Sequence, residues 1–132
     1  MKRILAIDFG LKRIGLAITD DRQKIALPLG VVEGGKKRVE NIRKALKGKE
    51  IEKIIVGLPL LLNGREGDMA ILVKAFAAEL EQAFGVPVQL VDERLSSKMA
   101  DRSLSELQLT RKKRTEQLDT TAATLLLQMF LF

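Results

Sequence analysis

The 132 residues, 46% of them hydrophobic, can bury one sizeable core but hardly two, so we expect a single domain over residues 1–132. No apolar run approaches the roughly 20 residues that span a bilayer, so we expect a soluble, cytoplasmic protein with no membrane partner. Cysteine and histidine are absent, which excludes disulfides, thiolate zinc sites and a histidine general base and leaves carboxylates, lysines and hydroxyl groups for any catalysis. The net charge of +6 favours contact with phosphate backbones.

The first part of the sequence predicts three strands. Runs rich in β-branched and apolar residues at 3–8 and 14–19 flank a short connection, which predicts a hairpin. A third strand is expected over residues 25–32. Pro28 indicates that this strand lies at an edge or carries a bulge, because proline cannot donate to a sheet ladder.

The middle of the sequence alternates helices with short strands. Apolar residues recur at helical spacing over residues 36–47, which predicts a helix with one face on the sheet. Residues 54–56 are wholly apolar, as is typical of a parallel strand covered on both faces. A loop over residues 60–67 then precedes a second helix. The buried stripe of that helix is predicted to contain Leu72, Phe76, Leu80 and Phe84.

The last third predicts one more strand and two helices. Residues 88–91 form the strand, which leads directly into Asp92 and Glu93. A helix capped by Ser96 or Ser97 is expected to reach about Leu104. The final helix begins near Leu118 and has one face made of Asp119, Ala122, Ala123 and Leu126. Its small alanines would let the helix backbone approach the sheet closely.

Three acidic residues stand at the ends of these elements: Asp8 closes the first strand, Glu93 follows the last strand and Asp119 opens the final helix. The order β-β-β-α-β-α-β-α, with an acid closing the first strand, predicts an α/β, ribonuclease H-like fold with a mixed five-stranded sheet flanked by helices. Because the carboxyl ends of parallel strands share one rim, Asp8 and Glu93 should lie together. Converging carboxylates are how a protein holds magnesium or manganese for phosphodiester cleavage.

Four motifs follow one another in the chain. They are Ile7-Asp8-Phe9-Gly10 with Lys12-Arg13-Ile14-Gly15, then Val56-Gly57-Leu58-Pro59-Leu60, then Asp92-Glu93-Arg94-Leu95-Ser96, and finally Leu118-Asp119 before Ala122-Ala123. Together, from about residue 3 to 130, they resemble the YqgF (RuvX) family, a RuvC-like branch of the ribonuclease H superfamily. That family is described as a Holliday-junction resolvase and is linked to maturation of the 5′ end of pre-16S ribosomal RNA.

The resemblance implies a metal-dependent nuclease, a hydrolase that leaves 5′-phosphate and 3′-hydroxyl ends. It makes Asp8, Glu93 and Asp119 the catalytic residues and metal ligands, with Asp92 as an auxiliary candidate. Two ions, Mg²⁺ or Mn²⁺, about 4 Å apart would share Asp8. RuvC-type resolvases place an acid at the end of the fourth strand. This chain has Gly57-Leu58-Pro59 there, so Glu93 on the neighbouring strand must substitute.

Each acidic candidate also has a purely structural interpretation. A carboxylate at the end of an apolar strand costs desolvation unless it is paired or metal-bound, which favours a ligand role for Asp8. Glu93 could instead pair with Arg94, and Asp119 could be only a helix-start charge. We favour ligand roles for both. For Asp92 we favour a structural hydrogen-bonding role.

Basic residues near these acids are candidates for binding nucleic acid. Lys12 and Arg13 follow the first acid, although a plain surface-hairpin role has equal weight. Further candidates are Arg94 and a cluster just before Asp119, made of Arg111, Lys112, Lys113 and Arg114. Lys36-Lys37-Arg38 is a second basic run, which we interpret as a solvated loop tip.

The sequence does not choose between nucleic acids. Trp and Tyr are absent and there are only five Phe, so a platform that stacks single-stranded bases is not expected. Binding should depend on backbone charge and shape, which suits structured RNA such as a ribosomal RNA precursor, or branched DNA. A monomer and a homodimer are both compatible with the sequence.

Two further interpretations belong to other functional classes. A similar Asp-x-Gly hairpin cradles nucleotide phosphates in the sugar kinase and actin superfamily, but those proteins enclose ATP with a second, duplicated domain, for which 132 residues leave no room. The other is a non-catalytic RNA-binding protein that retains the nuclease fold. Metal-dependent cleavage would separate it from a nuclease.

Overall fold

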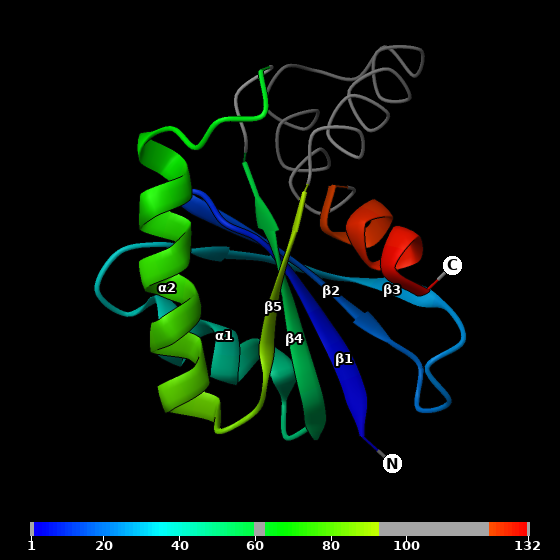
Figure 1. The fold of residues 1–132 in the computed structure, drawn as a ribbon. Helices are drawn as coiled ribbons and strands as arrows, with labels where there is room; N and C mark the ends of the chain where they lie inside the picture. Colours follow the sequence, from blue (N-terminus) through cyan, green and yellow to red (C-terminus); the bar gives the residue numbers. More distant parts are fainter. Residues whose placement is uncertain (1, 60–62, 93–121, 132) are drawn as a thin grey trace, which may run out of the picture.

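The computed structural model describes residues 2–59, 63–92 and 122–131 (Figure 1). Its centre is a five-stranded sheet in the order β3-β2-β1-β4-β5. In chain order the elements are β1 (Arg3–Asp8), β2 (Arg13–Thr19), β3 (Ala26–Glu33), α1 (Arg38–Leu46), β4 (Ile51–Leu58), α2 (Asp68–Phe84) and β5 (Val88–Asp92). Residues 122–131 are also helical, and we call this segment the C-terminal helix.

The middle strand, β1, sets the direction of its neighbours. β2 pairs antiparallel with β1 and β3 pairs antiparallel with β2, whereas β4 and β5 run parallel to β1. The three parallel strands therefore end together, at Asp8, Leu58 and Asp92. We call this edge the carboxyl rim; the arrowheads of β4 and β5 mark it at the top of Figure 1. The predicted mixed five-stranded sheet flanked by helices is confirmed.

The sheet divides the core into two layers, because side chains alternate between faces along each strand. Leu5 and Ile7 of β1 pack with Phe76 in the layer under α1 and α2. Ile4 and Ala6 point the opposite way, into the layer under the C-terminal helix. That second layer also contains Ala17, Ile55, Ala123, Leu126 and Leu127. Figure 1 shows α1 and α2 on one side of the sheet and the C-terminal helix on the other.

Small residues line the contact between the C-terminal helix and the sheet. Ala6, Ala17 and Ala123 are all completely buried. Because a methyl group is the largest side chain at these three positions, the helix backbone can approach the strands closely. The predicted burial of Ala122, Ala123 and Leu126 is confirmed. Asp119, which was expected on the same helix face, lies outside the described residues.

The third strand confirms both predictions made from Pro28. β3 is an edge strand. Its pairing with β2 also skips one residue, since Leu16 pairs with Gly30 while Ala17 pairs with Pro28. A bulge at an edge accommodates a residue that has no backbone N–H to donate.

The predicted buried stripe of α2 was partly wrong. Phe76 and Leu80 are buried, but Leu72 is 43% exposed and Val73 is buried in its place. Both positions lie one turn before Phe76, three or four residues away, so spacing alone does not decide which of them faces the sheet. The choice depends on how the whole helix packs against the sheet, which local spacing does not determine. Phe84 is only partly buried against the core.

The other element boundaries moved by a few residues at most. α1 is two residues shorter at its start than the predicted helix 36–47, and β4 extends the predicted strand 54–56 in both directions. The predicted helix from Ser96 or Ser97 to Leu104 lies outside the described residues. Among the described helices, none has the length and apolar character needed to cross a membrane.

Replacing Ala123 with leucine should push the C-terminal helix away from the sheet. Ala123 is completely buried against the second layer, so the larger side chain should lower the free energy of unfolding by about 1–3 kcal/mol. Urea denaturation measures this loss. Met129→Leu on the same helix is the control, because Met129 is 41% exposed. Equal stability of the two variants would contradict the close packing.

Candidate active site

Asp8 is the last residue of the central strand and lies half-buried at the carboxyl rim. It has the same parity along β1 as Ile4 and Ala6, which pack under the C-terminal helix. Its side chain therefore projects from that face of the sheet. Phe9, the next residue, packs on the opposite layer, where its ring lies 4.6 Å from that of Phe76 between centroids. The residues before and after Asp8, Ile7 and Phe9, therefore both pack on the layer under α1 and α2.

Glycine stands on each side of Asp8 in the sheet. Asp8 pairs directly with Gly15 of β2. On the other side Ile7 pairs with Val56 of β4, so the same register places Gly57 beside Asp8. Both glycines are in buried positions. On both neighbouring strands the residue in the same row as Asp8 is thus a glycine, and glycine inside a strand often marks a place where a ligand or another backbone approaches closely.

Asp92 lies at the same rim but belongs to the other face. Val88 and Leu90 pack against the layer under α1 and α2, and Asp92 continues their alternation. Val91 instead packs against the layer under the C-terminal helix and pairs with Gly57. β4 separates β5 from β1, so the two strand ends are about 10 Å apart. Asp8 and Asp92 therefore project from opposite faces of the sheet.

The end of β4 carries no acid. The strand ends at Gly57 and Leu58 and is followed by Pro59, as the sequence indicated. Within residues 2–59, 63–92 and 122–131 there is no group of three or more acidic residues that could hold a metal ion. Two of the three predicted ligands, Glu93 and Asp119, fall outside these ranges. So do Arg94 and the basic cluster Arg111, Lys112, Lys113 and Arg114.

The C-terminal helix approaches the carboxyl rim. Val91 of β5 packs in the same layer as Ala123, Leu126 and Leu127. In Figure 1 the beginning of this helix lies near the tip of β5. Asp119 precedes Ala122 by three residues in the sequence, and three residues of chain span about 10 Å at most.

Lys12 and Arg13 flank the start of β2 near Asp8, and both are exposed. The connection between β1 and β2 that leads into them is tight, because a Cβ added to Gly10 would lie only 2.4 Å from the backbone oxygen of Arg13. The structure therefore places these two predicted phosphate contacts at the same rim as Asp8.

Another described carboxylate, Asp20, has a structural role at the opposite end of β2. Its Oδ1 accepts hydrogen bonds from the backbone N–H groups of Ile25 (3.1 Å) and Lys24 (2.7 Å). These bonds, that of Ile25 first, lower the pKa of Asp20. The residue closes the turn into β3 and takes no part in the rim.

Gly15 and Gly57 belong to the sequence motifs, but the motifs alone did not identify them as part of the site. A glycine inside an otherwise apolar strand is a signal for close approach by a ligand or by another backbone. That signal was present in the sequence at both positions. Their alignment with Asp8 depends on the register between three strands, which the motifs do not contain.

Comparison with known proteins gives one family over nearly the full length. The model of the family RuvX, described as Holliday junction resolvase, matches residues 2–132. A protein of Protochlamydia amoebophila named "Putative pre-16S rRNA nuclease" is 46% identical over 98% of this chain and 92% of its own length. A protein of the same name from Chlorobium phaeobacteroides is 45% identical over 99% of this chain and 92% of its own.

The solved structures support the fold. RuvC of Thermus thermophilus, in complex with a Holliday junction substrate, has a TM-score of 0.54 and 21% sequence identity. The match covers 95% of this chain and 91% of the other. At this identity the likeness concerns the arrangement of sheet and helices.

A side chain at position 57 should crowd the space beside Asp8. We expect Gly57→Ala and Gly57→Val to lower the affinity for Mn²⁺ in that order, because each adds bulk in the row of Asp8. Titration calorimetry measures the affinity, and thermal unfolding of the same variants reports any loss of packing at this buried position. If Gly57→Val binds Mn²⁺ as the parent does, the row is not part of a metal site.

Proposed function

This chain belongs to the RuvX family, and from that premise we propose that it is a metal-dependent nuclease that hydrolyses phosphodiester bonds during maturation of the 5′ end of pre-16S ribosomal RNA. The names of its relatives at 45–46% identity support the substrate. The observation that carries the chemistry is the position of Asp8, a half-buried carboxylate at the end of the central strand between two glycines.

We propose Asp8, Glu93 and Asp119 as the metal ligands. Glu93 follows Asp92 and has the parity of Val91, which packs on the face from which Asp8 projects. The short reach from Ala122 supports Asp119. The opposite direction of Asp92 supports a structural role for that residue.

The donor set fits magnesium or manganese. Carboxylate oxygens are the ligands that these hard cations prefer, and the chain has no histidine or cysteine that would favour zinc. Bound there, two divalent ions would supply water activation and stabilisation of the departing oxygen. In this proposal the chain's own contribution would be to bring the three carboxylates to the metal and to bind the flanking phosphates through Lys12 and Arg13.

Asp8→Asn should abolish cleavage while the protein stays folded and binds nucleic acid. The change removes the charge of a ligand without altering its volume. Changes in residues that only orient the ligands cost about 10- to 100-fold, so we expect the loss of a ligand's own charge to lower the rate at least a hundredfold. Cleavage of a pre-16S ribosomal RNA fragment with Mg²⁺, Mn²⁺ or chelator measures it. Wild-type turnover by this variant would exclude Asp8 as a ligand.

The same assay separates the substrates. Cleavage of the ribosomal RNA precursor supports the proposal, whereas cleavage confined to a four-way DNA junction would make the chain a junction resolvase, the alternative that the family description favours. A protein that binds either nucleic acid but cleaves neither with any metal would be a binding protein with a nuclease fold.

The neighbours Asp92 and Glu93 should respond differently to loss of charge. We expect Glu93→Gln to reduce cleavage as strongly as Asp8→Asn does, with little change in melting temperature. Asp92→Asn should lower the melting temperature more than it lowers the rate, because Asp92 projects from the other face. Activity and thermal unfolding of the pair are measured side by side. A catalytic loss confined to Asp92→Asn would reverse the assignment.

A further inference from the structure

Two loops lie next to each other at the carboxyl rim. The first connects β1 to β2 over residues 9–12, and the second connects β3 to α1 over residues 34–37. Arg13 at the start of β2 pairs with Glu33 at the end of β3, so both loops leave the sheet at the end where Asp8 lies. We call them the first and second rim loops.

The backbones of the two rim loops are in direct contact. The N–H of Gly34 donates a hydrogen bond to the carbonyl oxygen of Lys12 over 2.9 Å. A Cβ at position 34 would lie 2.4 Å from the carbonyl oxygen of Leu11 and 3.2 Å from that of Gly10. No residue other than glycine fits this contact without moving one of the loops. The spacing of the two loops is therefore fixed.

One aromatic ring anchors both loops to the core. Phe76 of α2 is buried and contacts Phe9 from the first rim loop. The guanidinium group of Arg38, which follows the second rim loop, lies 5.8 Å from the centre of the same ring. Arg38 also donates to Glu79 Oε2 (2.6 Å) and to the carbonyl oxygen of Gly35 (2.9 Å). Arg38 is thus used to hold the loop in place.

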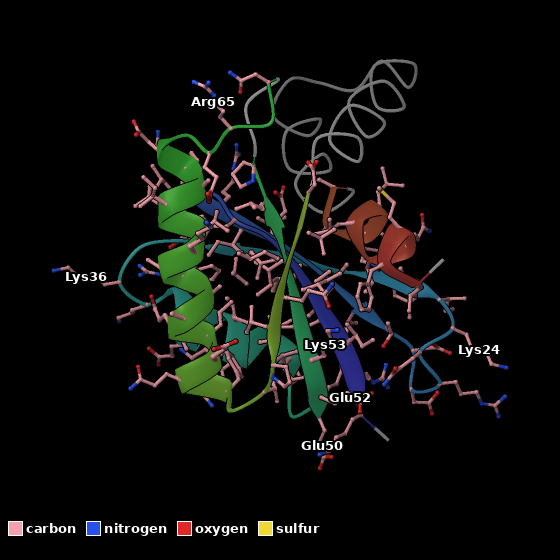
Figure 2. All side chains as sticks on the ribbon, in the orientation of Figure 1. Lys24, Lys36, Glu50, Glu52, Lys53 and Arg65 are labelled. Carbon is pink, nitrogen blue, oxygen red and sulfur yellow. The ribbon has the colours of Figure 1, made fainter. Side chains whose placement is uncertain are left out.

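The lysines of the two loops are not used in this way. Lys12, Lys36 and Lys37 are exposed, and Figure 2 shows Lys36 pointing away from the body of the protein. Among the described residues no ion pair involves these three lysines, in contrast to Lys44, which lies 3.6 Å from Glu40. Three exposed ammonium groups are therefore carried by two loops of fixed spacing, at the same end of the sheet as Asp8.

We propose that Lys12, Lys36 and Lys37 form one phosphate-binding surface that holds the substrate backbone at the end of the sheet where Asp8 lies. We call it the lysine surface. Its ligand is the phosphodiester backbone of a structured RNA or a branched DNA, bound by charge and without reading bases. The path of the substrate rests on the proposed nuclease function, which places the cleaved bond at Asp8. From there the strand extends over the first rim loop toward the β3 edge. Lys36 and Lys37, interpreted from sequence as a solvated tip, become substrate contacts.

The test compares two double variants. Lys36→Ala/Lys37→Ala removes two charges from the lysine surface. The matched control, Lys2→Ala/Lys24→Ala, removes two exposed lysines at the opposite end of the sheet, where Gln23 Nε2 donates to the carbonyl oxygen of Lys2. Figure 2 shows Lys24 and Lys36 on opposite sides of the molecule. Binding of a four-way DNA junction and of a pre-16S ribosomal RNA fragment is measured in chelator over a range of salt concentrations.

We expect the lysine-surface variant to bind the junction about tenfold or more weakly. The slope of log affinity against log salt should become shallower by about 1.8, since each lost contact with duplex DNA removes about 0.9. The control should keep the parent's slope, and all three proteins should melt alike. A lysine-surface variant with the slope of the control would overturn the proposal. The RNA arm shows which nucleic acid the surface prefers.

Gly34→Ala tests whether the two loops act as one surface. It removes no charge, but its Cβ must separate the loops. We expect a shallower salt slope than that of the parent, and an unchanged slope would show that the lysines bind independently. These measurements need no cleavage. If the parent never cleaves but the lysine-surface variant binds more weakly, the nuclease proposal fails and the lysine surface stands. If the parent cleaves but the lysine-surface variant keeps the parent's salt slope, the lysine surface fails and the nuclease proposal stands.

Discussion

The burial of β1 on both faces is the constraint on which the rest of the structure depends. Leu5 and Ile7 must face α1 and α2, while Ile4 and Ala6 must face the C-terminal helix. A shift of one residue in register would exchange the two sets and place Leu5 or Ile7 where Ala6 now packs against the C-terminal helix. The same alternation determines the direction of Asp8, so the packing of the core and the orientation of the candidate ligand have one cause.

The two layers of the core have different sizes, and the difference serves the site. Large side chains fill the layer under α1 and α2, where Phe76 also holds both rim loops. The other layer contains three completely buried alanines, Ala6, Ala17 and Ala123, beside its larger residues. The small side chains let the C-terminal helix pack closely on the face from which Asp8 projects. One layer therefore supports the two rim loops, and the other holds the C-terminal helix with its beginning near the rim.

Much of the fold could be predicted from local patterns. The hairpin, the parallel strands and the unusual third strand follow from alternation and from Pro28, which act over a few residues. The exposed position of Leu72 could not be predicted, because the choice between two adjacent positions depends on how α2 lies across the sheet. Asp8 was identified from its place at a strand end, whereas the glycines beside it gain their meaning from pairing between strands. The contact of Gly34 with the first rim loop joins distant segments, so Lys36 and Lys37 resembled an ordinary solvated turn.

The alanine-lined contact has a consequence for folding kinetics. The C-terminal helix covers strand residues from the beginning of the sequence, such as Ala6 and Ala17, so its docking closes one of the longest loops in the chain. Undocking would uncover the face of Asp8 while the hairpin and the larger layer stay folded. Hydrogen exchange in this helix thus reports how often the rim is dismantled without global unfolding.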